Sequence, residues 1–388
     1  MIGKDLLMNY YQESLKLHKK MQGKISVESK IKVEDNEMLS LIYTPGVAAP
    51  CEAIKENKEA VYDYTGKRNT IAVISDGTAV LGLGDIGPEA AIPVMEGKAM
   101  LFKQFGGINA VPICLATKDV DEVVQTIKNI APSFGGINLE DISSPRCFEI
   151  ERRLDQELDI PVFHDDQHGT AVVVAAGIIN AAKLVGKKLE SLRVVMNGPG
   201  AAGTAITKIL LGLGIHDIVV CDEFGILSKE TTKEQHKKEL AKATNPRAIR
   251  GALLEAIQGA DVFIGVSVPN VVNERMIQSM NEKPIVFAMA NPTPEISYDI
   301  AKQQGVAVMG TGRSDTPNQI NNLLAFPGIF KGALASRATE ITTAMKIAAA
   351  YAIAELIAPN QLREEYIIPE ILDDRLVAAV SEAVSEAW

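Results

Sequence analysis

A glycine-rich turn between a predicted strand and a predicted helix constrains the fold of this chain more than any other feature. The segment SLRVVMNGPGAAGTAITKILLGLG carries the pattern G-x-G-x-x-G at Gly198, Gly200 and Gly203. The next predicted strand, DIVVCD, ends at Asp222, 19 residues after Gly203. A strand, a glycine turn, a helix and an acidic strand end in this order are typical of a βαβ unit that binds a dinucleotide. The sequence therefore predicts a Rossmann-type sheet in the second half of the chain.

The positions of the turn have separate roles in the predicted nucleotide site. The first glycine permits the tight turn, the second lets the backbone approach a pyrophosphate, and the third allows close helix–strand packing. Asp222 would bind the ribose hydroxyls, and Glu223 beside it would repel a 2′-phosphate, which favours NAD over NADP. NADP remains an alternative cofactor, because the side chain of Lys229 is long enough to fold back over the site. The expected cofactor-binding residues in this region are Gly198, Pro199, Gly200, Ala201, Ala202, Gly203 and Asp222.

Short β-rich runs alternate with amphipathic segments along the chain, which predicts an α/β fold with two sheets. Near-continuous runs of Val, Ile and Ala indicate strands buried on both faces, as in parallel sheets covered by helices. A chain of 388 residues is also long for one core. We expect an N-terminal domain (1–162), a nucleotide-binding domain (163–335) and a C-terminal helical segment (336–388) that returns to the first domain. The expected strands include TIAVIS, INAVPICLA, IPVFHDD, SLRVVMN, DIVVCD, ADVFIGVS, PIVFAMAN and VAVMGTG.

Composition excludes several classes of partner. The formal net charge of −10 argues against nucleic acid, and it requires that an anionic substrate be captured by a metal or a few local cations. The four cysteines are scattered without a C-x-x-C pair, which favours free thiols in a reducing compartment. The N-terminus lacks the apolar run of a signal peptide, and the longest uncharged segment, 169–182, is too short to span a bilayer. We therefore expect a cytoplasmic protein without a membrane partner.

The stretch FHDDQHGTA raises the question of a metal site. His164 and His168 are four residues apart, the spacing of two zinc ligands on one helical face. However, IPVF before them predicts a strand and Gly169 follows at once, so the histidines are expected at a strand-to-helix turn and not as ligands. Asp165 and Asp166 would follow the end of that strand, where α/β enzymes place their sites.

A second acidic pair follows another strand-like segment, GGINLED. Glu140 and Asp141 would then lie beside Asp165 and Asp166 if the two strands are neighbours. Oxygen ligands of this kind select Mg²⁺ or Mn²⁺ over zinc. Acidic residues at such places also act as helix N-caps, so the spacing alone leaves ligand and cap as equal alternatives.

Two further patches complete the candidate site. LIYTPGVAAP places Tyr43 in a turn, and a glycine loop, GLGDIG, precedes a predicted helix that contains Lys98. The loop also fits G-x-G-x-x-G, but no acid ends a nearby following strand, so a second nucleotide site is not predicted. Taken singly, Lys98 and Tyr43 are more typical of a solvated lysine and a packing residue.

Together these residues resemble the malic enzyme family. The motifs follow one order along the chain, from about residue 43 to 330, and the length is similar to that of the small bacterial members. The matching motifs are YTPGVA with Tyr43, GLGDIG and the GK at Lys98, LED at Glu140 and Asp141, DDQHGTA at Asp165 and Asp166, ANPT at Asn291, and NQINNLLAFPGIF with Asn321 and Asn322. The resemblance implies a two-domain α/β oxidoreductase that converts malate to pyruvate and CO₂ with NAD or NADP and a divalent cation.

The resemblance also assigns roles. Glu140, Asp141 and Asp166 would hold Mg²⁺ or Mn²⁺, with Asp165 beside the ion as a further catalytic residue. Lys98, with its pKa lowered, would accept the hydroxyl proton of malate, and Tyr43 would protonate C3 of the enol. Asn291 and Asn321 would contact the substrate carboxylate or, for Asn291, the nicotinamide side.

The chain departs from larger members at two positions. Ala79 stands where they carry an arginine that holds a substrate carboxylate, and His164 stands where they have asparagine. The residue that contacts the second carboxylate of malate is therefore unassigned. A malolactic-type enzyme that releases lactate, and a catalytically silent NAD-binding sensor, are the alternative functions. The resemblance further implies a homodimer.

Overall fold

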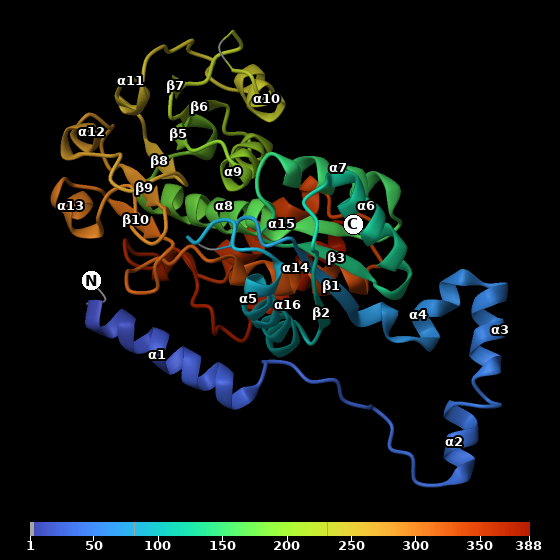
Figure 1. The fold of residues 1–388 in the computed structure, drawn as a ribbon. Coiled ribbons are helices and arrows are strands. Elements are labelled where there is room, and N and C mark those ends of the chain that lie inside the picture. Colours follow the sequence, from blue (N-terminus) through green and yellow to red (C-terminus); the bar gives the residue numbers. More distant parts are fainter. Residues whose placement is uncertain (1–3, 81, 231) are drawn as a thin grey trace.

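Two mainly parallel sheets organise the computed structural model, which describes residues 4–80, 82–230 and 232–388 (Figure 1). The predicted α/β fold with two sheets is confirmed, and the predicted strands all form. The first sheet contains, in spatial order, β2 (Asn109–Cys114), β1 (Thr70–Ser75), β3 (Gly136–Leu139) and β4 (Val162–His164). The second contains β10 (Val308–Thr311), β9 (Ile285–Ala288), β8 (Val262–Gly265), β5 (Arg193–Asn197), β6 (Asp217–Asp222) and the antiparallel edge strand β7 (Gly225–Ile226).

The strand order of the first sheet brings two distant segments together. β3 pairs in parallel with β4, in a register that places Leu139 opposite His164 at their carboxyl ends. The residues that directly follow these strands therefore start from the same edge of the sheet. The expected domain boundary after residue 162 lies within β4, so the first sheet extends to His164. The helices that follow the strands of this sheet are α5 (Pro88–Leu101), α6 (Val120–Ile130) and α7 (Arg146–Glu157).

Helix α8 (Asp165–Val185) connects the two sheets and lies in the core of the molecule. Its uncharged middle is buried almost completely, because α9 (Ala201–Gly212) and the C-terminal helix α15 (Thr343–Glu355) pack against it. Among the described residues it is the one helix long and apolar enough to cross a bilayer, and 78% of its apolar window is buried within the protein. The helices of the second sheet are α9 (Ala201–Gly212), α10 (Gln235–Ala243), α11 (Leu253–Ile257), α12 (Glu274–Gln278) and α13 (Tyr298–Gln303).

The C-terminal helices return to the first half of the chain. In α14 (Phe326–Ala335) the ring of Phe326 lies 4.7 Å from that of Phe102, and the ring of Phe330 lies 5.8 Å from that of Phe163. α15 (Thr343–Glu355) packs against α8, and α16 (Leu376–Glu386) packs against α14 and α15. The C-terminal helices thus share one hydrophobic core with residues of the first sheet.

The N-terminal segment is arranged differently from the rest. α1 (Lys4–Met21), α2 (Asn36–Ile42) and α3 (Ala48–Glu56) extend along and away from the body, which the chain joins through α4 (Val61–Tyr64) (Figure 1). α2 and α3, described throughout, contain no buried residue. Several large apolar side chains of this segment face solvent, among them Leu39, Leu41, Tyr43 and Val47. Such an apolar, unpacked arm is typical of a surface that binds another chain.

Candidate active site

Three carboxylates converge at the edge of the first sheet. Glu140 and Asp141 follow β3, and Asp166 lies in the first turn of α8 directly after β4. One oxygen from each of these residues lies within 4.8 Å of the others. The two loops are also hydrogen-bonded, because the backbone N–H of Asp141 donates to Oδ2 of Asp166 at 2.8 Å. The structure thus brings together the three residues that the resemblance assigns as metal ligands.

The carboxyl groups of Glu140, Asp141 and Asp165 are buried and close together, which destabilises their ionised forms and raises their pKa values. Burial, followed by the charges of Asp166 and Glu140, raises the pKa of Asp141 to about 9. Burial also raises the pKa of Asp165 to about 7 and shifts the pKa of Glu140 upward, although Lys98 opposes both effects. Oδ2 of Asp141 is buried without a hydrogen-bond partner among the described residues. A hard divalent ion such as Mg²⁺ or Mn²⁺ fits this all-oxygen, electronegative set.

Lys98 is enclosed by the acidic residues. Its Nζ lies 2.6 Å from Oδ2 of Asp165 and 3.1 Å from Oε1 of Glu140, and 4.0 Å from the ring centroid of Phe326. Burial alone would lower the pKa of Lys98, but the charges of Asp165 and Glu140 outweigh it and raise the pKa. The expected lowering of the pKa of Lys98 depends on a cation bound beside it; the described residues alone shift the pKa upward, because two carboxylates stabilise the ammonium form.

An asparagine completes the surroundings of Asp165. Nδ2 of Asn322 donates to Oδ2 of Asp165 at 2.5 Å. The Oδ1 atom of Asn321 instead accepts from the backbone N–H of Leu323 and caps the short helix there. Asn322, and not Asn321, is thus the residue that lines the cavity beside Asp166. The two residues adjoin in the sequence, and the turn decides which of them points inward.

The cluster opens into a cavity of about 630 Å³. Ala79 lines it, with its backbone N–H bonded to the carbonyl oxygen of Asp141 at 2.9 Å. The N-terminal segment contributes Ser14, His18 and Lys24 to the lining. The remaining lining residues that matter for the chemistry are Lys98, Glu140, Asp141, Asp166 and Asn322.

Lys24 approaches this cavity from a segment that sequence reasoning passed over. Its Nζ donates to the carbonyl oxygen of Pro93 at 2.5 Å, and its backbone N–H donates to Oε2 of Glu96 at 3.2 Å. Both partners belong to α5, the helix that carries Lys98. The ammonium group of Lys24 therefore lies beside α5 at Pro93, five residues before Lys98. No periodic pattern in the sequence indicates that residue 24 packs against this helix.

Two predicted residues lie elsewhere. Tyr43 ends α2 on the projecting arm, where its side chain is 67% exposed, and it does not line the described cavity. Asn291 is exposed in the loop after β9, where its carbonyl oxygen lies against Gly82 of the glycine loop. Within one chain, the structure does not bring Tyr43 to Lys98.

The two histidines do not form a site together. His164 ends β4 and is fully buried, whereas His168 lies one turn into α8 and contacts Glu151. The metal-like cluster contains neither of them. His164 thus ends the strand and His168 lies in the following helix, as expected of a strand-to-helix turn.

A second cavity, of about 600 Å³, lies over the glycine turn of the second sheet. α9 begins at Ala201 directly after the turn, so its N-terminus faces this cavity. A Cβ atom at Gly203 would lie 2.0 Å from the carbonyl oxygen of Gly198, which explains the glycine there. Asp222 lines the cavity, as expected of a ribose ligand.

Lys237 is a cation that the sequence analysis missed in this cavity. Its Nζ lies 3.3 Å from Oδ2 of Asp222 and 2.8 Å from Oε1 of Glu234, at the start of α10. Lys229, the lysine that was considered, does not line the described cavity. A basic group beside the ribose acid bears directly on the choice between NAD and NADP.

Family models match nearly the whole chain. The model described as malic enzyme, N-terminal domain, matches residues 22–155, and the one described as malic enzyme, NAD binding domain, matches residues 167–387. The break between them coincides with the passage from β4 into α8.

Known proteins resemble the chain over similar lengths. The NAD-dependent malic enzyme of Geobacillus stearothermophilus is 58% identical over 94% of this chain and 76% of its own length. The bifunctional malic/malolactic enzyme of Bacillus subtilis is 55% identical over 98% and 93% of the two chains. The crystal structure of the NAD-dependent malic enzyme of Thermotoga maritima superposes with a TM-score of 0.93 at 50% identity, covering 96% of this chain and 98% of that one.

Proposed function

This chain belongs to the malic enzyme family, and we propose that it oxidises and decarboxylates L-malate to pyruvate and CO₂ while reducing NAD or NADP. The observation that carries the proposal is the position of Lys98. It lies between Asp165 and Glu140, at the wall of a cavity that also exposes Asp141 and Asp166. A basic group beside a cluster of oxygen ligands suits the removal of a proton from a hydroxyl group.

Glu140, Asp141 and Asp166 would hold a divalent cation in this proposal. When bound, Mg²⁺ or Mn²⁺ supplies Lewis-acid stabilisation for the negative charge that develops on the substrate oxygen during oxidation and decarboxylation. The protein contributes the three carboxylates and the hydrogen bond that links the two ligand loops. A cation held by this cluster would also offset the charge of a dianionic substrate, which a chain with a net charge of −10 otherwise repels.

Lys98 and Asp165 would move the hydroxyl proton. Lys98 must lose a proton before it can accept one from the substrate hydroxyl, and Oδ2 of Asp165, 2.6 Å from its Nζ, lies within hydrogen-bond distance to receive that proton. Asn322 donates to the same oxygen and fixes the carboxylate. This relay explains how a lysine with a raised pKa takes part, because its own proton can leave as the substrate proton arrives.

The distal carboxylate of malate requires a further cation, and Lys24 supplies one. Lys98 is engaged by two carboxylates, which leaves Lys24 and His18 as the other basic side chains among the described residues that line the cavity. His18 is bonded to the carbonyl oxygen of Ser14 within its own helix, whereas the ammonium of Lys24 has donors beyond its bond to Pro93. Lys24 thus takes the role that Ala79 cannot fill.

Tyr43 would act from a second copy of the chain. In its own chain it lies on an exposed arm and does not reach the cavity, yet a phenol is suited to protonate the enol carbon. The arm carries unpacked apolar side chains that a homodimer would bury. We therefore place Tyr43 in the partner's cavity, so that the site is complete only in the dimer.

The cofactor preference rests on Asp222. Its carboxylate is positioned to bind a ribose, which supports NAD, while Lys237 beside it makes NADP a possible substrate as well. All four cysteines are free, in keeping with a cytoplasmic location.

Product analysis tests the proposal and separates it from its alternative. The purified protein is incubated with L-malate and Mn²⁺ and with either NAD or NADP, and then pyruvate, lactate and free reduced cofactor are quantified. We expect pyruvate and reduced cofactor in equal amounts. Lactate without net reduced cofactor would favour the malolactic reaction, an activity named for the Bacillus subtilis relative. Turnover of neither kind would refute both.

A further inference from the structure

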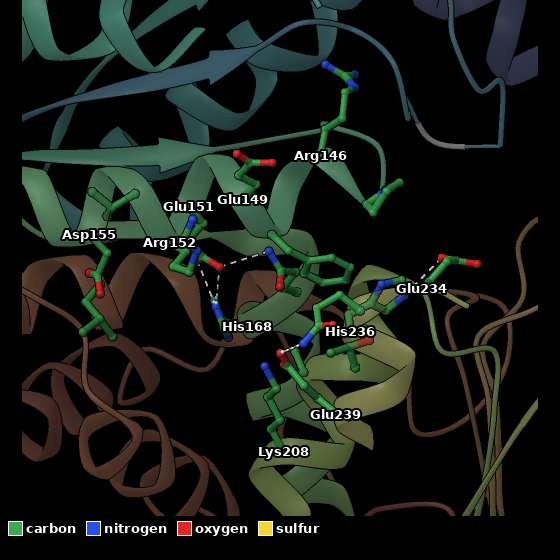
Figure 2. Close-up of a pocket in the computed structure, with 18 of the residues that line it drawn as sticks. Arg146, Glu149, Glu151, Arg152, Asp155, His168, Lys208, Glu234, His236 and Glu239 are labelled. Atoms are coloured by element: carbon green, nitrogen blue, oxygen red, sulfur yellow. Dashed lines mark hydrogen bonds and ion pairs between the residues drawn. The ribbon is translucent and has the colours of Figure 1, made fainter. Parts of the chain in front are cut away.

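The carboxylate of Glu151 accepts hydrogen bonds from three residues of the turn between β4 and α8. Glu151 lies on α7, and its Oε1 accepts from the backbone N–H of His164 at 2.9 Å. Its Oε2 accepts from Nε2 of Gln167 at 3.1 Å, and Nε2 of His168 lies 3.0 Å away (Figure 2). The His168 ring nitrogen must donate, because an ionised carboxylate offers only acceptors.

These donors flank two residues of the candidate active site. His164 precedes Asp165 and Asp166, and Gln167 and His168 follow them directly. Glu151 lines a cavity of about 700 Å³ between α7 and the helices of the second half of the chain, whereas Asp166 lines the candidate active-site cavity. Glu151 thus contacts the turn from a cavity other than the one that the carboxylate cluster lines.

The start of α8 has no side-chain cap of its own. His164, the N-cap residue of α8, makes no side-chain capping hydrogen bond. Glu151 accepts the backbone N–H of this N-cap residue, which places a negative charge near the positive end of the helix dipole. Burial alone would raise the pKa of Glu151, but the charge and hydrogen bond of His168 outweigh it and hold the pKa at about 2. The carboxylate is therefore ionised.

We propose that Glu151 is a positioning residue that fixes the turn 164–168 and thereby sets the directions of Asp165 and Asp166. This inference rests on the proposed function only for the roles of those two aspartates. Without Glu151, the N–H of His164 and the side chains of Gln167 and His168 lose a common acceptor, and the turn gains alternative conformations. Groups hydrogen-bonded directly to metal ligands commonly contribute 10- to 100-fold to metal affinity, and we take the same range for Glu151 because its three hydrogen bonds hold the turn that carries Asp166.

The test measures Mn²⁺ affinity of the metal-free, full-length protein by electron paramagnetic resonance, without malate. Glu151→Ala is compared with Glu151→Gln and with Glu149→Ala. Glu149 lies on the same helix and is 55% exposed, so it serves as the matched control. We expect Glu151→Ala to weaken Mn²⁺ binding about 10- to 100-fold, Glu151→Gln to recover much of the loss through its remaining acceptor, and Glu149→Ala to match wild type.

Parallel measurements distinguish positioning from a purely structural role. Circular dichroism establishes that each variant is folded at the assay temperature, and NAD affinity reports on the second sheet. A folded Glu151→Ala variant that binds Mn²⁺ as wild type does would overturn the proposal, even if its melting temperature falls. If wild type binds Mn²⁺ but does not convert malate, the proposed function fails, while the comparison of Mn²⁺ affinities still decides the role of Glu151.

Discussion

Lys98 is held in its ammonium form by Asp165 and Glu140, at 2.6 and 3.1 Å from its Nζ. A base in this setting needs a nearby acceptor for its own proton, and Asp165 provides one. The residue that resembled a catalytic lysine in the sequence is therefore better described as one half of a Lys98–Asp165 pair. Sequence spacing could not predict that pair, because 67 residues separate its members.

Replacement of Lys98 should separate the two half-reactions. We expect Lys98→Met to lower the rate of malate oxidation by about 10²- to 10⁴-fold, the usual contribution of a general base. Decarboxylation of supplied oxaloacetate should persist in part, since that step requires no proton removal from a hydroxyl group. Both rates are measured spectrophotometrically on the same preparation. Equal losses in the two reactions would contradict the assignment of Lys98 to the oxidation step.

Lys24 is expected to determine specificity for the distal carboxylate. Lys24→Met should raise the KM for malate about 10- to 100-fold, the effect of losing one charged hydrogen bond of about 1.5–3 kcal/mol. The KM for NAD should not change. Lys16→Met is the control, because Lys16 lies on α1 in an exposed pair with Glu13 and outside the cavity lining. An unchanged malate KM in Lys24→Met would remove Lys24 from the substrate site.

Among the elements, strands and the glycine turn were predictable because their signals are local. TIAVIS forms β1 over the predicted residues, and DIVVCD forms β6, since runs of apolar residues report burial on both faces. The glycine turn was recognisable because each of its glycines is needed for a close contact within one short segment. The sequence did not predict the positions of Lys24, Lys237 and Asn322 in their cavities, because these positions depend on contacts between segments far apart in the chain.

The glycine turn allows a matched pair of substitutions. A Cβ atom at Gly203 would collide with the carbonyl oxygen of Gly198, whereas a Cβ atom at Gly200 meets no atom within 4 Å. Gly203→Ala should therefore destabilise the fold, by about 1–3 kcal/mol for an overpacked position. Gly200→Ala should keep the melting temperature but weaken NAD binding, because the new methyl group hinders the approach of the pyrophosphate.

Differential scanning calorimetry and NAD titration measure the two effects separately. If Gly200→Ala binds NAD as tightly as wild type, the pyrophosphate does not approach this turn and the fingerprint interpretation is wrong. If Gly203→Ala melts at the wild-type temperature, the close packing of α9 on the turn is more adaptable than the geometry indicates.

At the scale of the whole molecule, the exposed arm and the incomplete site have one common explanation. A second copy would cover the apolar side chains of α2 and α3 and would bring Tyr43 to a cavity that already holds Lys98. A single sequence predicted a homodimer only through family resemblance. The proposal that two chains share one site rests on the position of Tyr43 on the arm.

Complementation between two inactive variants tests the shared site. Tyr43→Phe and Lys98→Met should each lose malate turnover as pure dimers. When the two are unfolded together and refolded, or co-expressed with different tags, mixed dimers should regain part of the wild-type activity, because one of their two sites is intact. No recovery in mixed dimers isolated by both tags would place Tyr43 and Lys98 in the same chain's site or exclude Tyr43 from the reaction.

We propose that Glu140, Asp141 and Asp166 hold the divalent cation on which malate turnover depends. The most direct measurement is a Mn²⁺ titration of EDTA-treated protein with L-malate and NAD, followed by absorbance at 340 nm and run in parallel on wild type and Asp166→Asn. We expect wild-type activity to rise from near zero with Mn²⁺ occupancy, and Asp166→Asn to need far more Mn²⁺ or to remain inactive. Turnover of the wild type without metal, or a wild-type titration curve for Asp166→Asn, would contradict this proposal.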